Sequence, residues 1–501
     1  MASTDRPEVD TTSGRVRGVA ADGVAVFRGI PFAAPPFGAH RFLPPQPPAP
    51  WDGLRDASQF GAAYPQKSLD PDPLRNSYFN PTVIGADCLN LNVWTPDPGT
   101  SGLPVMVWIH GGGYMTGAGS AVAHDGAAFA RDGVVYVSIN YRMHVDGFLY
   151  LGDDVANLGL RDQVAALEWV RDNIANFGGD PGNVTIFGQS AGGVSVMHLL
   201  AMPTAQGLFR RAIAQSGSTR VIAPVDLAMR ITKRAGELFD RPPTPDGLRD
   251  LDGDPLLAGV VGFAFEYLAP VFWGPESFLI SPFRPVVHDT LPTDVLTAVR
   301  GGMNADVDVM AGCTQDECTF AMQPFGLLDN LEPTWLAAAL DTFGVTMADL
   351  DVYRKATRPE AADPELLMAA WTDWAFRGPA IDLLDAHAGT GTGRTFGYEF
   401  TWPSPSMPFL GSAHALELPF VFDGLDAFVK NHPEHENPLG DSPPQELADR
   451  MHKAWIDFAT TGDPGWPAYD SASRTAMQFD TTSGPIDDWA APERDLWIAP
   501  R

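Results

Sequence analysis

The sequence predicts an α/β fold, in which one large and mostly parallel β-sheet is covered by helices on both faces. Short apolar runs with many β-branched residues recur along the chain, and glycine or polar turns bound each of them. Helical patterns lie between these runs. Strands that alternate with helices form parallel sheets, because each helix carries the chain back along the sheet. The expected strands are residues 105–110, 134–141, 183–188, 210–217 and 306–312.

The clearest helical pattern covers residues 160–178. It ends at two consecutive glycines, which are suited to close a helix. Polar, proline-containing tracts near 240–300 and 431–446 predict surface excursions from the sheet. The apolar residues of the helical pattern recur every three or four positions and so share one face: Val164, Leu167, Val170 and Ile174.

The composition describes a globular protein with a strongly negative surface. The 501 residues are 45% hydrophobic and 19% charged, and 62 acidic against 33 basic residues give a formal net charge of −29. Such a surface repels phosphates and anionic lipid headgroups. We therefore expect neither nucleic acid nor a membrane among the partners of this protein.

No segment predicts export or membrane insertion. The N-terminal residues contain no uninterrupted apolar stretch, and nowhere do about eighteen apolar residues follow one another. The 3 cysteines are odd in number and too few for a disulfide framework. We expect a soluble, cytoplasmic protein. Cys313 and Cys318 lack metal-ligand spacing with any histidine, so we expect core thiols there and no metal site.

The stretch NVTIFGQSAGG, residues 183–193, predicts a nucleophile. A strand ends abruptly in Gly-Gln-Ser-Ala-Gly, and a helical pattern follows at once. Glycines are tolerated on both sides of Ser190 because a tight turn from strand to helix leaves no room for Cβ atoms. Such a turn exposes the serine hydroxyl at the N-terminus of the helix, where it can attack a carbonyl group.

The stretch WIHGGGY, residues 108–114, predicts donors for the oxyanion that forms in such an attack. A buried strand ends here, and three glycines in line can bring unhindered N–H groups against a substrate oxygen. A phosphate-binding loop is excluded, because neither Lys nor Ser/Thr follows in the order that such a loop requires.

An acid and a histidine are expected after the serine. The strand 306–312 is followed by Asp316 and Glu317, and periodicity alone does not choose between these two carboxylates. Of five downstream histidines, only His414 joins a turn of small residues to a strongly apolar run, so we expect it to act as the base. The cluster HPEHE, residues 432–436, lacks the spacing of a zinc site and predicts a solvated loop.

These motifs resemble those of the type B carboxylesterases. This branch of the α/β-hydrolases includes bacterial p-nitrobenzyl esterases, carbamate herbicide hydrolases, cholinesterases and the non-catalytic neuroligins. The resemblance implies an α/β-hydrolase fold in a single domain, residues 1–501. It runs through the segments 26–42, 86–96, 108–114, 157–193, 208–218, 312–317, 411–422 and 455–464.

The resemblance also implies roles at single positions. By this resemblance, Glu317 is the acid that orients His414. Ser216 is a residue that supports the catalytic residues without contacting the substrate. By this resemblance, the reaction needs neither a metal nor a cofactor. The N–H groups that the resemblance assigns to the oxyanion are those of Gly112, Gly113 and Ala191.

The chain departs from this family at three positions. Secreted members carry a cysteine bridged to the one that matches Cys88, but this chain has Tyr64 there, which favours a cytoplasmic location. The residue before the nucleophile is Gln189 and not Glu, and Phe79 stands where cholinesterases place a Trp. We expect Phe79, Tyr114 and Gln189 to contact the substrate, and we do not expect specificity for choline esters.

The sequence thus predicts a serine hydrolase that acts on neutral carboxylic esters, aryl or alkyl, through an acyl-enzyme. Carbamate or amide hydrolysis uses the same residues, and the sequence does not separate these reactions from ester hydrolysis. A non-catalytic adhesion or scaffold protein of the same fold is disfavoured, because Ser190, Glu317 and His414 are all retained.

Overall fold

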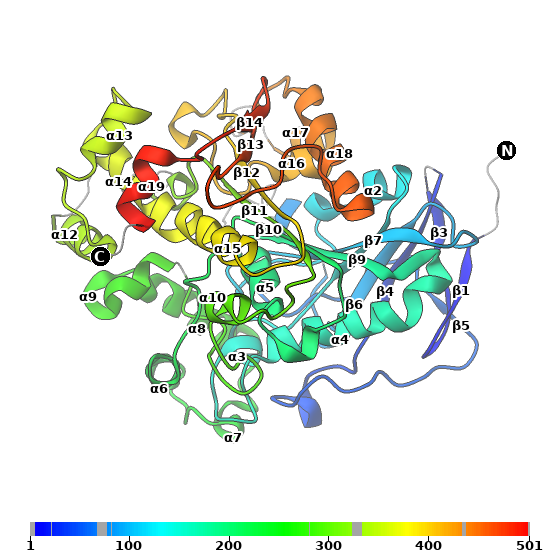
Figure 1. Ribbon diagram of the computed structural model, residues 1–501. Helices are drawn as coiled ribbons and strands as arrows, with labels where there is room; N and C mark the ends of the chain where they lie inside the picture. The colour runs from blue at the N-terminus through cyan, green and yellow to red at the C-terminus, as the bar shows by residue number, and fades with distance from the viewer. Residues whose placement is uncertain are drawn as a thin grey trace.

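A twisted β-sheet runs through the middle of the molecule (Figure 1). The computed structural model describes residues 6–21, 23–67, 78–81, 83–279, 281–322, 333–432 and 437–498. Across the described residues the sheet has eleven strands. In spatial order they are β14 (Gly484–Ile486), β13 (Ala476–Phe479), β12 (Thr395–Phe400), β11 (Asp308–Thr314), β10 (Arg211–Gln215), β9 (Gly179–Gln189), β7 (Leu103–Ile109), β8 (Val135–Ile139), β6 (Asn90–Thr95), β4 (Val24–Pro31) and β3 (Val19–Ala21).

The centre of the sheet is parallel and its edges are antiparallel. All neighbours from β13 to β8 pair in parallel, whereas β14 and the strands β6, β4 and β3 pair antiparallel. The five strands expected from the sequence are β7, β8, β9, β10 and β11, so the predicted α/β fold is confirmed. Gln215 pairs with both Gln189 and Gly312. The central strands therefore end together, and the residues that follow them gather at one edge of the sheet.

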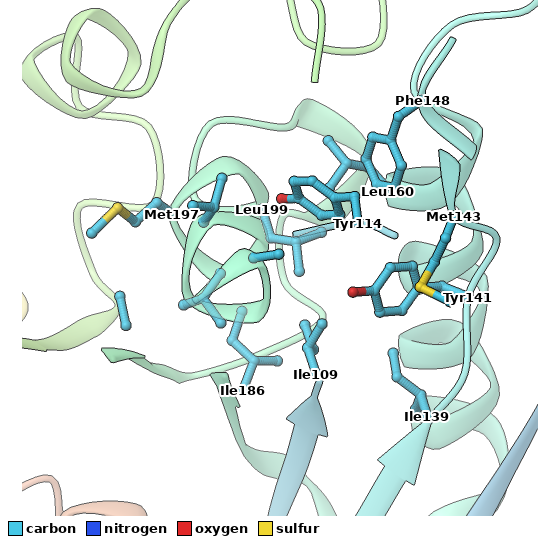
Figure 2. Packing of buried hydrophobic residues seen from close by; sticks show 14 of the residues in the cluster. Ile109, Tyr114, Ile139, Tyr141, Met143, Phe148, Leu160, Ile186, Met197 and Leu199 are labelled. Atoms are coloured by element: carbon cyan, nitrogen blue, oxygen red, sulfur yellow. The ribbon is translucent and has the colours of Figure 1, made fainter. Parts of the chain in front are cut away.

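Alternate residues of β7 pack into two separate hydrophobic cores. Val105 and Ile109 belong to one core, whereas Met106 and Trp108 belong to the other. This is the period-2 alternation of a strand that is covered on both faces. Figure 2 shows the first core, in which Ile109, Ile139 and Ile186 from three neighbouring strands pack with Met197 and Leu199.

Helices cover both faces of the sheet. On one face lie α4 (Leu158–Asn173), α5 (Ala191–Leu199) and α15 (Gly378–Ala388), and on the other lie α2 (Ala127–Arg131) and α18 (Gln445–Thr461) (Figure 1). The other described α-helices are α3 (His144–Phe148), α6 (Val225–Phe239), α7 (Pro245–Leu248), α8 (Gly253–Tyr267), α9 (Pro270–Trp273), α10 (Val295–Arg300), α11 (Thr319–Met322), α12 (Pro333–Phe343), α13 (Asp351–Ala356), α14 (Asp363–Thr372), α16 (Leu418–Val421), α17 (Leu425–Asn431) and α19 (Ala491–Ile498).

Smaller elements complete the fold. A second sheet consists of β1 (Glu8–Thr11), β2 (Gly14–Arg17) and β5 (Leu54–Asp56). A 3-10 turn over Ile174–Phe177 follows α4, and Gly178 closes it with φ 90°.

Among the described helices, none combines the length and the apolar composition that a membrane crossing requires.

The tract 240–300, expected as a surface excursion, forms helices α7 to α10, of which α7 lies at the lower edge and α9 at the left side of the view (Figure 1). It also contributes to the interior, because Leu248 and Phe263 are fully buried and Phe278 lines the same pocket as Ser190. In the second expected excursion, 431–446, residues 433–436 lie outside the described residues, and with them most of the HPEHE cluster.

Candidate active site

Ser190 lies in a strained turn between β9 and α5. It takes φ 58° and ψ −125°, a conformation that L-residues rarely adopt. Its N–H donates to the carbonyl of Gln215 at 3.0 Å, and its own carbonyl accepts from Val194 at 2.8 Å. A Cβ atom at Gly192 would overlap the carbonyl oxygen of Ile109, so only glycine fits there. The turn is held from both sides, and it places the half-buried serine at the wall of a pocket.

A glycine loop lies beside this serine. Gly112 and Gly113 take φ 105° and 62°, and a Cβ at Gly112 would overlap the carbonyl of Thr116. Within the described part of the chain, the N–H groups of Gly112, Gly113 and Ala191 donate to no protein acceptor. All three residues border the same pocket as Ser190. These N–H groups are therefore available to a negatively charged oxygen at this wall.

Glu317 and His414 meet at the edge of this pocket. Glu317 is fully buried, and one of its carboxylate oxygens accepts from the N–H of Thr314 at 2.7 Å. The other oxygen receives the Nδ1 atom of His414. The imidazole ring packs against Phe320 and Phe376, whose ring centroids lie 4.9 and 5.2 Å away. The carboxylate fixes Nδ1 as a donor, so Nε2 of the neutral ring is an acceptor.

Asp316, the alternative carboxylate, serves the backbone of the histidine loop. One of its oxygens binds Arg358 at 2.6 Å, and the other accepts from the N–H of Ser412 at 2.9 Å. Gly411 takes φ 57° directly against this carboxylate, where a Cβ would overlap it. Asp316 thus pins the chain just before His414 without touching the imidazole ring.

The side chain of Gln189 contacts the second ring nitrogen of His414, Nε2. Its side-chain amide nitrogen lies 3.1 Å from Nε2 of His414, and the residue is only 4% exposed. In the described part of the chain, no hydrogen bond joins the hydroxyl of Ser190 to His414. The structure thus brings serine, glutamine and histidine to one pocket wall, with the amide directed at the free nitrogen of the ring.

The pocket has a volume of about 410 Å³ and a mostly apolar wall. Its described lining contains two histidines and no carboxylate, lysine or arginine. Burial lowers the pKa of one of them, His124, to about 4, so that ring is neutral at pH 7. Such a pocket suits an uncharged ligand. Its apolar lining includes Phe79, Met115, Val194, Val221, Phe278, Leu279, Phe320, Phe376 and Leu418.

Two of the expected site residues lie deeper in the protein. Tyr114 borders the pocket, but its side chain is 1% exposed and packs in the core against Phe148 (Figure 2). Its hydroxyl lies 3.1 Å from that of Ser195, and its expected contact with substrate stays a prediction. Ser216 is fully buried behind the serine turn, and its N–H donates to Gly312 at 2.8 Å.

The sequence analysis missed Glu417, which follows His414 by three residues. It is fully buried, and its Oε1 accepts from the side chain of Gln215 at 3.4 Å. Its Oε2 has no hydrogen-bond partner among the described residues. Burial, together with the nearby Glu317 carboxylate, raises the pKa of Glu417 to about 7. The available signal was one acidic residue inside the apolar run 413–422.

Comparisons with known proteins place nearly the whole chain in one family. The sequence model of the carboxylesterase family matches residues 5–494. The chain is 36% identical over 490 residues to para-nitrobenzyl esterase of Bacillus subtilis, with 94% of each chain covered. It is 34% identical over 490 residues to phenmedipham hydrolase of Pseudarthrobacter oxydans, with 93% of each covered. The solved carboxylesterase EST55 of Geobacillus stearothermophilus at pH 6.2 superposes with a TM-score of 0.85 at 36% identity, over 98% of this chain and 100% of that one.

Proposed function

We propose that Ser190, Glu317 and His414 form the catalytic triad of this chain, which belongs to the carboxylesterase family and is a carboxylic ester hydrolase. The observation that carries the triad is the contact of the buried Glu317 carboxylate with Nδ1 of His414, beside the pocket that the strained Ser190 turn enters. Nucleophile, base and orienting acid are the three roles that acyl transfer requires.

The reaction proceeds through an acyl-enzyme. Oγ of Ser190 attacks the ester carbonyl carbon while Nε2 of His414 takes the hydroxyl proton, and Glu317 stabilises the imidazolium that results. The N–H groups of Gly112, Gly113 and Ala191 bind the oxyanion. The C–O bond then breaks, and the alcohol leaves with the proton from His414. Water attacks the acyl-enzyme with the same histidine as base, which releases the carboxylic acid and restores the serine.

The substrate class is that of small, neutral esters with apolar acyl and alcohol groups. The apolar wall and the absence of charged side chains other than histidine in the described lining support this proposal. Carbamates are the second candidate class, because their carbonyl group meets the same serine in the same way. The similarity to phenmedipham hydrolase and to para-nitrobenzyl esterase supports testing both classes.

The test is active-site labelling combined with a substrate panel. A fluorophosphonate should modify Ser190 alone, as located by peptide mass spectrometry. Matched aryl esters, aryl carbamates and anilides of one acyl size then rank the leaving groups. Label on another residue, or turnover that survives complete labelling of Ser190, would contradict the proposal.

We further propose a single catalytic domain in the cytoplasm. The family match over residues 5–494 supports one domain. The three cysteines are all buried and unpaired, and Tyr64, where secreted relatives are expected to have a cysteine, donates its hydroxyl to Asp146. Thiol titration of the unfolded chain, purified without reductant, should return all three thiols. A protected pair would argue for an oxidising compartment.

A further inference from the structure

The Nε2 atom of His414 is already occupied in the resting enzyme. A neutral imidazole carries one N–H, and Glu317 holds that proton on Nδ1. Nε2 therefore presents a single lone pair. The amide of Gln189 lies 3.1 Å from it and is oriented as the donor of a hydrogen bond.

Ser190 needs the same lone pair. Its hydroxyl must donate to Nε2 before the proton can move, and no described hydrogen bond joins the two groups. Gln189 is the preceding residue, it is buried, and it belongs to β9, so its amide approaches the ring from the same strand end as the serine. An sp² nitrogen accepts one strong hydrogen bond along its lone pair, so the amide and the hydroxyl compete for it.

We propose that Gln189 is a positioning residue that caps Nε2 of His414 in the resting enzyme and must release it before Ser190 passes its proton to the ring. The inference rests on the proposed triad and deepens it. Gln189 exchanges no proton in this step: the hydroxyl proton moves to Nε2 as the oxygen–carbon bond forms. The amide N–H faces Nε2, so it favours the neutral ring and opposes an N–H at that atom.

The charged neighbours of the His414 ring determine how a substitution of Gln189 should change the protonation of that ring. Glu317 faces Nδ1, and Glu417, fully buried on the same segment as His414, acts on the ring through space. The rings of Phe320 and Phe376, which pack against the imidazole, are uncharged. From the β9 side, the described hydrogen-bond partner of Nε2 is the neutral amide of Gln189, so an exchange at this residue changes that interaction.

The experiment compares wild type with Gln189→Met, which removes the donor, and Gln189→Glu, which adds a charge at nearly constant shape. The readout is the second-order rate constant for labelling of Ser190 by a fluorophosphonate from about pH 5 to 9, the range that spans histidine titration. The acid-limb midpoint should rise from wild type to Met and again to Glu, the last by about one unit or more. On the alkaline plateau the Met variant should react about two- to tenfold faster than wild type, because one net hydrogen bond is lost.

Controls separate this inference from the triad. Gln206→Glu adds the same charge at an exposed site and should leave the acid limb in place. Equal midpoints for wild type, Met and Glu would overturn the capping role, and so would a Met variant that labels more slowly at every pH. If wild type is not labelled at Ser190, the triad itself fails. Thermal unfolding identifies a misfolded variant, and either substitution alone suffices to test the order of the midpoints.

Discussion

Asp316 and Glu317 are adjacent in the sequence, but their carboxylates bind different partners. Asp316 binds Arg358 and the backbone of the loop before His414, whereas Glu317 binds the imidazole of His414 itself. The Asp316 carboxylate therefore supports the loop, whereas the Glu317 carboxylate contacts the ring. A pair of isosteric substitutions can therefore separate orientation of the base from support of its loop.

Glu317→Gln should lower kcat/KM by about 10³- to 10⁴-fold, because it removes the charge that stabilises the imidazolium. Asp316→Asn keeps an acceptor for Ser412 and loses only the ion pair with Arg358, so we expect a loss of stability with kcat/KM within about tenfold of wild type. Steady-state kinetics and urea unfolding of both variants test this. The opposite order of losses in kcat/KM would exclude Glu317 as the acid.

Ser190→Ala should reduce kcat by about 10⁴- to 10⁶-fold while the protein stays folded. The removed hydroxyl makes no described hydrogen bond to His414, so the substitution breaks no described hydrogen bond of the ring. Ester turnover and circular dichroism of the same preparation check both parts. An alanine variant that kept a tenth of the wild-type rate would show that another residue is the nucleophile.

Glu417 should make the free energy of unfolding fall as the pH rises. Its pKa is raised from 4.5 to about 7, so the folded state binds this proton more tightly than the unfolded state does. The resulting stabilisation is complete below the unfolded pKa and is lost as the pH rises through the folded pKa. At about 1.4 kcal/mol for each pH unit, the loss amounts to roughly 3 kcal/mol.

Urea unfolding at about pH 5 and about pH 8 measures this effect. Glu417→Gln should remove it, so that the variant loses less stability than wild type between the two pH values. Glu446→Gln, at an exposed position of α18, is the matched control and should follow wild type. Parallel losses in wild type and Glu417→Gln would contradict a raised pKa at this carboxyl group.

A choline ester should be hydrolysed no better than its neutral 3,3-dimethylbutyl analogue. The described pocket lining carries no carboxylate, and Phe79 offers at most a cation–π contact worth about 0.5 to 2 kcal/mol. Gln189→Glu should shift the ratio of kcat/KM toward the choline ester, because two unit charges about 4 Å apart attract by about 4 kcal/mol at an effective dielectric of 20. Competition of the two esters near pH 8 measures the ratio. A wild-type preference for choline of about tenfold or more would require an acidic residue that the described pocket lacks.

The sequence by itself determined the fold class and the nucleophile turn. Strands such as β7 and β9 are short apolar runs whose pattern is local, and the strained conformation of Ser190 depends on glycines within two residues of it. Both features are determined by residues close together in the sequence, because backbone sterics and side-chain periodicity act over a few positions. The resemblance to a family then extended the expectation to Glu317 and His414.

Only the tertiary structure decided the contacts between distant segments. Glu317 and His414 are 97 residues apart, and Gln189 and His414 are 225 apart. Periodicity could not separate Asp316 from Glu317, place the ring of Tyr114 in the core, or reveal the shifted pKa of Glu417. The physical reason is that hydrogen bonds, close packing and desolvation depend on which groups the folded chain brings within a few ångströms, and the parallel sheet sets this by ending its central strands at one edge.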